Sequence, residues 1–389
     1  MKDYVVSTQD EYDNIKNDKD ARIIIRNTAC IIEVKGNERV TAAYASHVSA
    51  GENAVIEALE NAEVTLHDSA ESTTRDTARV SAFGNATAYC YGNSTVFAYE
   101  NSNVFVYNDT NVQSFEKAVI KAHHNTHVTA YGNSYVLARN QAAVVAYETA
   151  VVRSADNVLV HAFGKSKVDA AGRSQVIARG ESHVHAGDNA RVRSFDSSYA
   201  EVMNEASVIA KNSSRIDARE NAKIIASDEV TVDAIGNARV TATGRVTVEA
   251  FDSVRVEAKG SIKIYAHDSA AIIAEGNASV HAFGNPDITG GPGVSVARFP
   301  AAPLSLPGEE NTAENFGKNY MALAKAREFR HNPVHAGRLL IRNAGHGNRE
   351  KILLMLYKNG CHSRRDIRDY LLKLSAEPGR RSGDHELER

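Results

Sequence analysis

Tryptophan is absent from this 389-residue chain, and cysteine, methionine and proline are scarce, with three, four and seven residues. The cysteines, Cys30, Cys90 and Cys361, are odd in number and far apart, so they imply no disulfide framework. No run of about 18 apolar residues exists that could span a membrane. The N-terminus also lacks the apolar core of a signal peptide. We therefore expect a cytoplasmic protein, or one that is exported without a cleaved signal.

A strong charge of one sign is also lacking. The formal net charge is -3 at pH 7, so no overall basic field points to nucleic acid. The balance is uneven, because residues 309–389 hold 16 Lys and Arg against 11 Asp and Glu, a surplus of +5. The other 308 residues therefore sum to -8. Any contact with nucleic acid is expected from the C-terminal part of the chain.

What the chain does contain is an eight-residue repeat from Asp20 to Phe283, which we read as 33 units without insertion or deletion. With octads numbered from Gly84, position 5 is Val or Ile in 23 of the 25 units up to Phe283, and position 7 is Ala in 19. These positions alternate with variable ones, which is the period of a β-strand with one buried face. Positions 1 and 2 favour Gly, Asp, Glu and Asn, which tolerate the positive φ of a tight corner. The pattern predicts an all-β repeat fold, a parallel β-solenoid.

The outward residues indicate how many octads form one coil. Aromatic residues recur at position 8 of every second octad, acidic residues recur at position 6 with the same period, and a period of three octads mixes these series with others. Two octads per coil predict a flattened, two-sided solenoid of about 16 coils with two facing parallel sheets. Its small inward side chains require the sheets to lie close together, which leaves no room for an internal ligand. Cys30 and Cys90 occupy such inward positions.

Both ends of the repeat are predicted to differ from it. Residues 1–19 do not fit the octad, and Thr8 with Glu11 has the spacing of a capping box. We expect a short helix there that caps the open end of the stack. Pro286 cannot donate a ladder hydrogen bond, and glycines and prolines follow it, so we predict an end turn and a linker at residues 284–309.

The octads of residues 20–283 resemble the Gly-Asn-Ala-x-Val-x-Ala units of bacterial and phage β-solenoid proteins. The coil of two octads is also similar to that of bacterial ice-nucleation proteins. The resemblance implies the solenoid fold but no function, because such scaffolds host unrelated roles.

After the linker the apolar period becomes helical. Residues 310–376 are predicted to form a small helical domain with its own core, followed by a disordered tail at 377–389. Residues 349–374 resemble a helix-turn-helix, which implies binding to DNA, although a helical hairpin that binds protein has the same spacing. The basic residues that would contact either partner are Arg364, Arg365, Arg368 and Lys373.

The aromatic column at position 8 is the most distinctive candidate surface. Stacked aromatic residues stiffen a sheet, and they mark a binding face where they are exposed together. The sequence leaves both roles open. The candidate binding residues are Tyr99, Phe115, Tyr131, Tyr147 and Phe163.

The acidic column at position 6 is a candidate for cation binding. Carboxylates stacked at about 4.8 Å could hold a cation or raise one another's pKa. The weak metal candidates are Asp169, His185 and Glu201. The alternative is a solvated row of charges relieved by neighbouring cations such as Lys167 and Arg215.

These features together predict a non-enzymatic scaffold that presents the solenoid surface, while a basic helical domain engages a protein partner. We expect no catalytic residue, no cofactor and no membrane partner, and an oligomer through the helical domain is left open. One alternative is a DNA-binding regulator that acts through the C-terminal segment. A second is a carbohydrate-active or metal-binding β-helix enzyme with its site on the acidic column.

Overall fold

The computed structural model describes residues 2–299 together with Leu356 and Tyr370. The chain divides into two compact units, Met1–Arg298 and Phe299–Arg389. The predicted helical domain and tail therefore lie outside the described residues, apart from those two positions. Among the described residues, no helix is long and apolar enough to cross a membrane.

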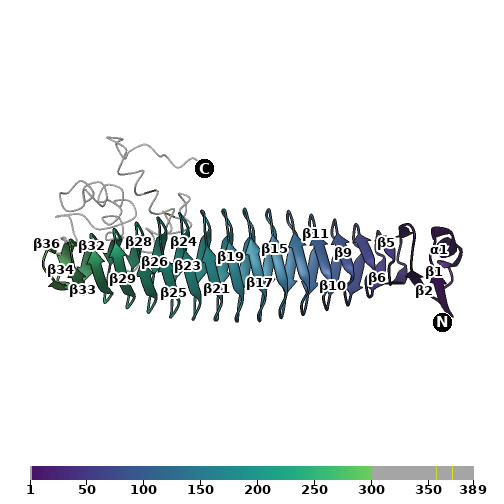
Figure 1. Cartoon of the computed structure of the whole chain (residues 1–389), viewed down its shortest axis with the longest axis horizontal. Coiled ribbons are helices and arrows are strands. Elements are labelled where there is room, and N and C mark those ends of the chain that lie inside the picture. Colours follow the sequence, from purple (N-terminus) through teal and green to yellow (C-terminus); the bar gives the residue numbers. More distant parts are fainter. Residues whose placement is uncertain (1, 300–355, 357–369, 371–389) are drawn as a thin grey trace, which may run out of the picture. The chain divides into compact units, whose positions relative to one another are not determined.

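The first unit is a parallel β-solenoid whose strands alternate between two sheets (Figure 1). Sheet A has 19 strands: β1 (Lys2–Val6), β2 (Ala21–Arg26), β4 (Arg39–Ala43), β6 (Val55–Ala58), β8 (Glu71–Thr74), β10 (Thr87–Cys90), β12 (Asn103–Val106), β14 (Val119–Ala122), β16 (Tyr135–Ala138), β18 (Val151–Ser154), β20 (Lys167–Ala170), β22 (His183–Ala186), β24 (Tyr199–Val202), β26 (Arg215–Ala218), β28 (Thr231–Ala234), β30 (Thr247–Ala250), β32 (Lys263–Asp268), β34 (Ser279–Gly284) and β36 (Ser295–Phe299). Sheet B contains β3 (Ile32–Val34), β5 (His47–Ala50), β7 (Glu63–Leu66), β9 (Arg79–Ala82), β11 (Thr95–Ala98), β13 (Asn111–Ser114), β15 (His127–Ala130), β17 (Ala143–Ala146), β19 (Leu159–Ala162), β21 (Gln175–Ala178), β23 (Arg191–Ser194), β25 (Ser207–Ala210), β27 (Lys223–Ala226), β29 (Arg239–Gly244), β31 (Arg255–Gly260), β33 (Ala271–Glu275) and β35 (Asp287–Gly290).

The strand register confirms the coil of two octads. From β3 to β35, each strand pairs with the next strand of its own sheet at an offset of two octads, as in Val96↔Val112 of sheet B. The inward positions are closed to solvent, and Val96 and Ala98 are both 0% exposed. Val, Ile and Ala columns from the two sheets thus form one continuous core along the unit. Because this core is narrow and filled, a binding site on the solenoid must lie on its outer surface.

The corner of each octad combines a positive φ with a side-chain hydrogen bond along the stack. In a typical coil the Asn85 N–H donates to the Asp68 carbonyl of the previous coil at 2.7 Å, whereas the Gly84 N–H donates to the Glu100 carboxylate of the next coil at 2.7 Å. The same bond recurs at many corners. Asp and Glu are therefore frequent at position 1 because they tolerate positive φ and also accept this backbone N–H.

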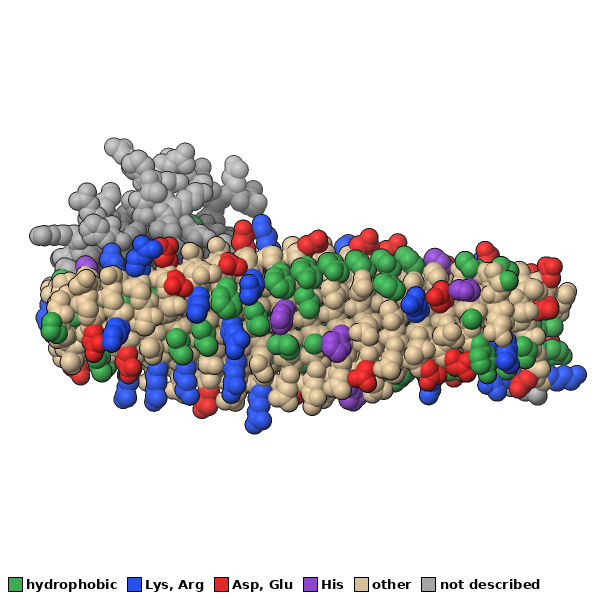
Figure 2. All heavy atoms as spheres, viewed as in Figure 1, with side chains coloured by type: hydrophobic (Ala, Val, Ile, Leu, Met, Phe, Trp, Pro, Cys, Tyr) green, Lys and Arg blue, Asp and Glu red, His purple; other side chains and the backbone are tan. Residues whose placement is uncertain are grey.

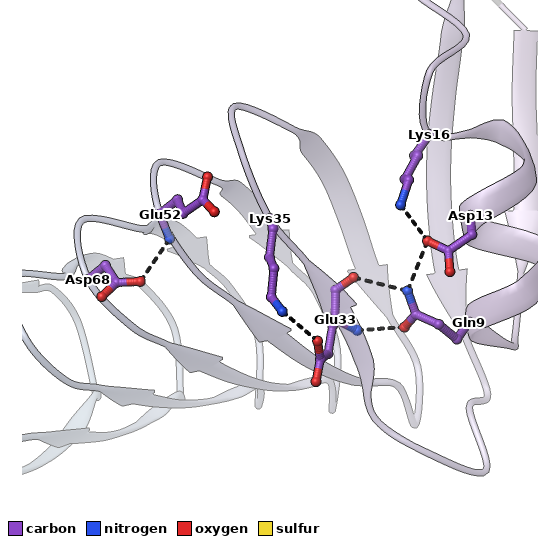
Figure 3. Close-up of polar contacts among 7 residues, drawn as sticks. All are labelled: Gln9, Asp13, Lys16, Glu33, Lys35, Glu52 and Asp68. Atoms are coloured by element: carbon purple, nitrogen blue, oxygen red, sulfur yellow. Dashed lines mark hydrogen bonds and ion pairs between the residues drawn. The ribbon is translucent and has the colours of Figure 1, made fainter.

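The short helix predicted near the N-terminus is confirmed as α1 (Gln9–Ile15), with Thr8 as its N-cap. Glu11 makes the capping interactions in a shifted form: its N–H donates to Thr8 Oγ1, while its carboxylate accepts at 2.8 Å from the N–H of Ser7, the residue before the N-cap. The Gln9 amide accepts from the Glu33 N–H at 2.8 Å and donates to the Glu33 carbonyl at 3.2 Å, as a neighbouring strand would (Figure 3). This amide closes the edge of sheet B. Sheet A is extended instead by β1, which the sequence analysis missed.

The first coil departs from the predicted register. Ile23 pairs with Val40, one residue beyond the offset of two octads, so the reading of an uninterrupted repeat from Asp20 is wrong there. Three consecutive isoleucines, residues 23–25, show no alternation that could select the buried face. The residue added before β3 also leaves Cys30 exposed, contrary to the prediction, whereas Cys90 is buried as predicted.

The predicted linker begins too early. The register of two octads continues through β35, where Ala271 pairs with Asp287, and β36 follows in sheet A. Pro286 is tolerated because it lies at position 3, whose N–H normally makes a local turn bond, as the Ala70 N–H does with the His67 carbonyl at 3.0 Å. A proline at this position removes no ladder hydrogen bond.

The corner bond can be tested at Asp156, which has φ 65° and accepts from the Asn140 N–H at 3.0 Å. Asp156→Asn keeps an acceptor and tolerates positive φ, so we expect little change in stability. Asp156→Gly loses a bond of about 1 kcal/mol. Asp156→Ala loses the bond and adds about 1–2 kcal/mol of left-handed strain. Urea denaturation followed by circular dichroism should rank the variants Asn, Gly, Ala from most to least stable. An alanine variant as stable as the asparagine variant would contradict a stabilising role of the corner hydrogen bond.

Thiol labelling tests the first coil. In a Cys361→Ser variant, we expect one thiol, Cys30, to react rapidly with Ellman's reagent at pH 8. The second should react only after denaturation, because burial raises the pKa of the Cys90 thiol to about 12 and keeps the reagent out. Two fast thiols, or none, would show that the coil around Cys30 has a different structure.

Candidate functional site

The predicted aromatic column is a stacked ladder on one edge of sheet B. Ring centroids lie 4.7–5.2 Å apart and ring planes differ by 3–13° from Phe83 to Phe163, with His67 stacked on Phe83 at 5.5 Å. The phenylalanine and tyrosine side chains are half-buried, and His67 at the end of the stack is exposed. Figure 2 shows hydrophobic side chains gathered in a continuous row over the middle coils. The stacked rings, named here the aromatic ladder, are His67, Phe83, Tyr99, Phe115, Tyr131, Tyr147 and Phe163.

The stacking limits what the aromatic ladder can bind. Each internal ring covers the faces of its two neighbours, so a sugar or a base has no free ring face on which to stack. The ring edges, and the hydroxyls of Tyr99, Tyr131 and Tyr147, are what the ladder offers to solvent. Such a strip suits an apolar protein surface with a few hydrogen-bonding groups. The aromatic ladder can have both a structural and a binding role, because the ring faces stack on one another and the ring edges are exposed to a partner.

A shorter aromatic row lies at the same octad position beside sheet A. Tyr91, Tyr107 and His123 stack at 4.9 and 5.2 Å. Burial lowers the pKa of the His123 imidazole, and the neighbouring His124 and Arg139 lower it further. His123 therefore stays largely neutral at pH 7 and behaves as a stacked ring. Among the described residues, no group of three or more His, Cys, Asp or Glu could hold a metal ion.

The acidic column lies on sheet A in the predicted register. Asp169 pairs with His185, and His185 pairs with Glu201. The carboxylates are occupied by cations, however, since Arg153 Nε lies 3.3 Å from Asp169 and Arg219 forms an ion pair with Glu201. The three weak metal candidates are therefore adjacent but are not arranged as a metal site.

Further along, the column becomes a buried polar network. Arg215 contacts both Asp217, at 3.8 Å, and Asp233, at 2.5 Å. The Tyr199 hydroxyl donates to Asp217 at 2.8 Å, and burial, followed by the charge of Asp217, raises the pKa of this hydroxyl above its ordinary value. Asp217 and Asp233 are only 2% and 5% exposed. An arginine that bridges successive coils neutralises the repulsion between stacked carboxylates.

The C-terminal candidates Arg364, Arg365, Arg368 and Lys373 lie outside the described residues. Their predicted contact with DNA or protein stays a prediction.

One surface was not predicted. Sheet B carries a column of exposed cations at octad position 4 in its C-terminal half, formed by Arg191, Lys223, Arg239 and Arg255. Reading position 4 in every second octad would have found it, but position 4 varies too much when both sheets are read together.

Comparison of the chain with protein-family models, with curated proteins and with solved structures finds no match. The geometry of the solenoid surface is therefore the basis for proposing a function.

The contribution of ring stacking to the stability of the fold can be measured at Tyr131. Tyr131→Ala removes the stacks on Phe115 and Tyr147, and at about 0.5–1.5 kcal/mol each it should cost about 1–3 kcal/mol. Phe195→Ala is the matched control, because Phe195 occupies the same octad position but is contacted by the Arg179 guanidinium at 5.2 Å. Chemical denaturation should show the larger loss for Tyr131→Ala. Equal losses would mean that ring stacking adds nothing beyond burial.

Proposed function

We propose that this protein is a non-enzymatic binding scaffold whose solenoid presents in-register columns of side chains to a protein partner. The observation that carries the proposal is the aromatic ladder. Six phenylalanine and tyrosine rings are held at one per coil with nearly parallel planes and exposed edges. Few folds hold so many apolar groups at a fixed spacing on an outer surface, and a partner can bind them without ordering them.

The continuous hydrogen-bond ladder supports the rigidity that a scaffold needs. Each described coil from β3 to β35 is hydrogen-bonded to the coils on either side at a constant offset of two octads. Surface groups far apart in sequence are therefore fixed relative to one another. The basic residues Arg364, Arg365, Arg368 and Lys373 are proposed as a second contact with the same partner. The arginines that occupy the acidic column give no support to the alternative of a β-helix enzyme.

Capture by the full-length chain tests the proposal. We expect Tyr99→Glu with Tyr131→Glu, placed two coils apart, to abolish recovery of partner proteins from lysate of the source organism, because the charges project from the exposed ring edges. The matched control is Asn103→Glu with Tyr135→Glu, which has the same spacing on sheet A. Circular dichroism verifies that both variants keep the wild-type fold.

The proposal requires that the control recover the same proteins as the wild type while the ladder variant does not. Identical recovery by all three proteins would remove the aromatic ladder as a binding surface. Loss with both variants would assign binding to the fold as a whole.

A further inference from the structure

The outer face of sheet B changes character between β21 and β31. Its central column, at octad position 6, contains Ile177, Arg193, Ile209, Ile225, Thr241 and Glu257 in successive coils. Ile209 is 38% and Ile225 54% exposed, Ile177 is half-buried, and Arg193 is an exposed cation between Ile177 and Ile209. Ile209 and Ile225 pair in adjacent coils, so their exposed side chains form one apolar patch, and such patches are a feature of interaction surfaces. We name the outward residues of these six strands the cationic strip, because of the residues that flank this column.

Cations lie on both sides of the aliphatic column. One flank, at position 4, contains Arg191, Lys223, Arg239 and Arg255, and the other, at position 8, contains Arg179, Lys211 and Lys259. All seven are exposed, and Figure 2 shows Lys and Arg side chains aligned along one border of the C-terminal half of the stack. Within these described strands, Glu257 is the one acidic residue among the outward positions.

The fold uses two of these cations, since Arg179 lies over the Phe195 ring at 5.2 Å and Lys259 is 3.5 Å from the Glu275 carboxylate. The central cations of the position 4 flank are different. Lys223, Arg239 and Arg255 follow one another in adjacent coils, an arrangement that places like charges directly opposite and is unfavourable. None of the three forms an ion pair or hydrogen bond through its side chain with another part of the chain that the structure describes. On sheet A, by contrast, Arg215 neutralises the stacked carboxylates of Asp217 and Asp233. The charges of Lys223, Arg239 and Arg255 are therefore available to a partner.

The shape of the strip selects among anionic partners. Nucleic acid would use the cations but not the isoleucines, which offer nothing to phosphates. A broad anionic lipid surface would also meet the acidic corners that border the strip, such as Asp196 and Asp228 on one side and Glu205 and Glu220 on the other. From position 4 to position 8 the strip is about 13 Å wide. That width equals one α-helix, whose diameter with side chains is about 10–12 Å.

We infer that the cationic strip binds an acidic amphipathic helix of a protein partner. The apolar stripe of that helix lies on the adjacent Ile209 and Ile225, and its flanking carboxylates pair with the two cationic columns. Six strands span about 24 Å, which corresponds to a helix of about 16 residues. This site is separate from the aromatic ladder and does not depend on it.

The test uses the full chain and a fluorescent synthetic helix of that length, with Leu at i, i+3, i+4 and i+7 and Glu on both flanks. A peptide with Gln in place of Glu is its control. We expect the Glu peptide to bind, and Lys223→Glu with Arg239→Glu to weaken binding at least about tenfold in fluorescence anisotropy. Ile209→Ser with Ile225→Ser should also weaken it several-fold. Lys117→Glu with Arg139→Glu, which makes the same charge change away from the strip, should leave the affinity unchanged.

Several results would overturn the inference. One is equal binding of the Glu and Gln peptides, and another is no effect of the charge reversal. A third is tighter binding of oligo(dT) or of phosphatidylserine vesicles than of the peptide, with an affinity that the isoleucine substitutions do not change. That result would show that the strip binds polyanions in general. The ladder variants Tyr99→Glu and Tyr131→Glu should bind the Glu peptide normally, so failure of this site and failure of the proposed function are distinguishable.

Discussion

Parallel pairing at a constant offset of two octads is the constraint from which the rest of the structure follows. Each side chain lies about 4.8 Å from its equivalent in the next coil, so every octad position becomes a column along the unit. Inside, this repetition is favourable, because Val stacks on Val and Ala on Ala between two close sheets. On the outer surface the repetition places similar side chains next to one another. Whether this stabilises or destabilises the fold depends on the chemistry of the side chain.

The energetic effect of stacking similar side chains differs among the outer columns. Aromatic rings gain from being stacked, so the ladder from Phe83 to Phe163 requires no other partner. Corner carboxylates, as at Glu100, are separated from one another by accepting a backbone N–H from the coil before. Carboxylates on sheet A are bridged by Arg215. The cations Lys223, Arg239 and Arg255 of sheet B lack any such compensation among the described residues, which is why we assign them to binding of a partner.

The sequence was sufficient to predict the core of the solenoid, but it did not predict the structure where the apolar pattern is ambiguous. Val or Ile at position 5 with Ala at position 7 predicts the strand, its buried face and its neighbours, and the register bears this out for every coil from β3 onward. The isoleucine run in β2 could place either face inward, so the first-coil offset was not predictable. The corner hydrogen bonds were not predicted, because a preference for positive φ is enough to explain Gly, Asn, Asp and Glu at position 1. Only those side chains that have an acceptor oxygen can also accept the backbone N–H of the preceding coil.

The same geometry restricts the partner. The inward residues of the solenoid are too small and too closely packed to admit a ligand, so a partner of the solenoid must contact columns that run along the stack. A compact partner would touch a few coils, whereas an elongated one engages many. An α-helix advances about 5.4 Å per turn against about 4.8 Å per coil, so it drifts by about 0.6 Å each turn. After four or five coils the mismatch approaches half a coil. Long Lys and Arg side chains can absorb such drift and isoleucine cannot. The arrangement of the proposed site agrees with this, because its cations extend to Arg255 and Lys259 while the exposed isoleucines of the same face stop at Ile225 and resume only at Ile273.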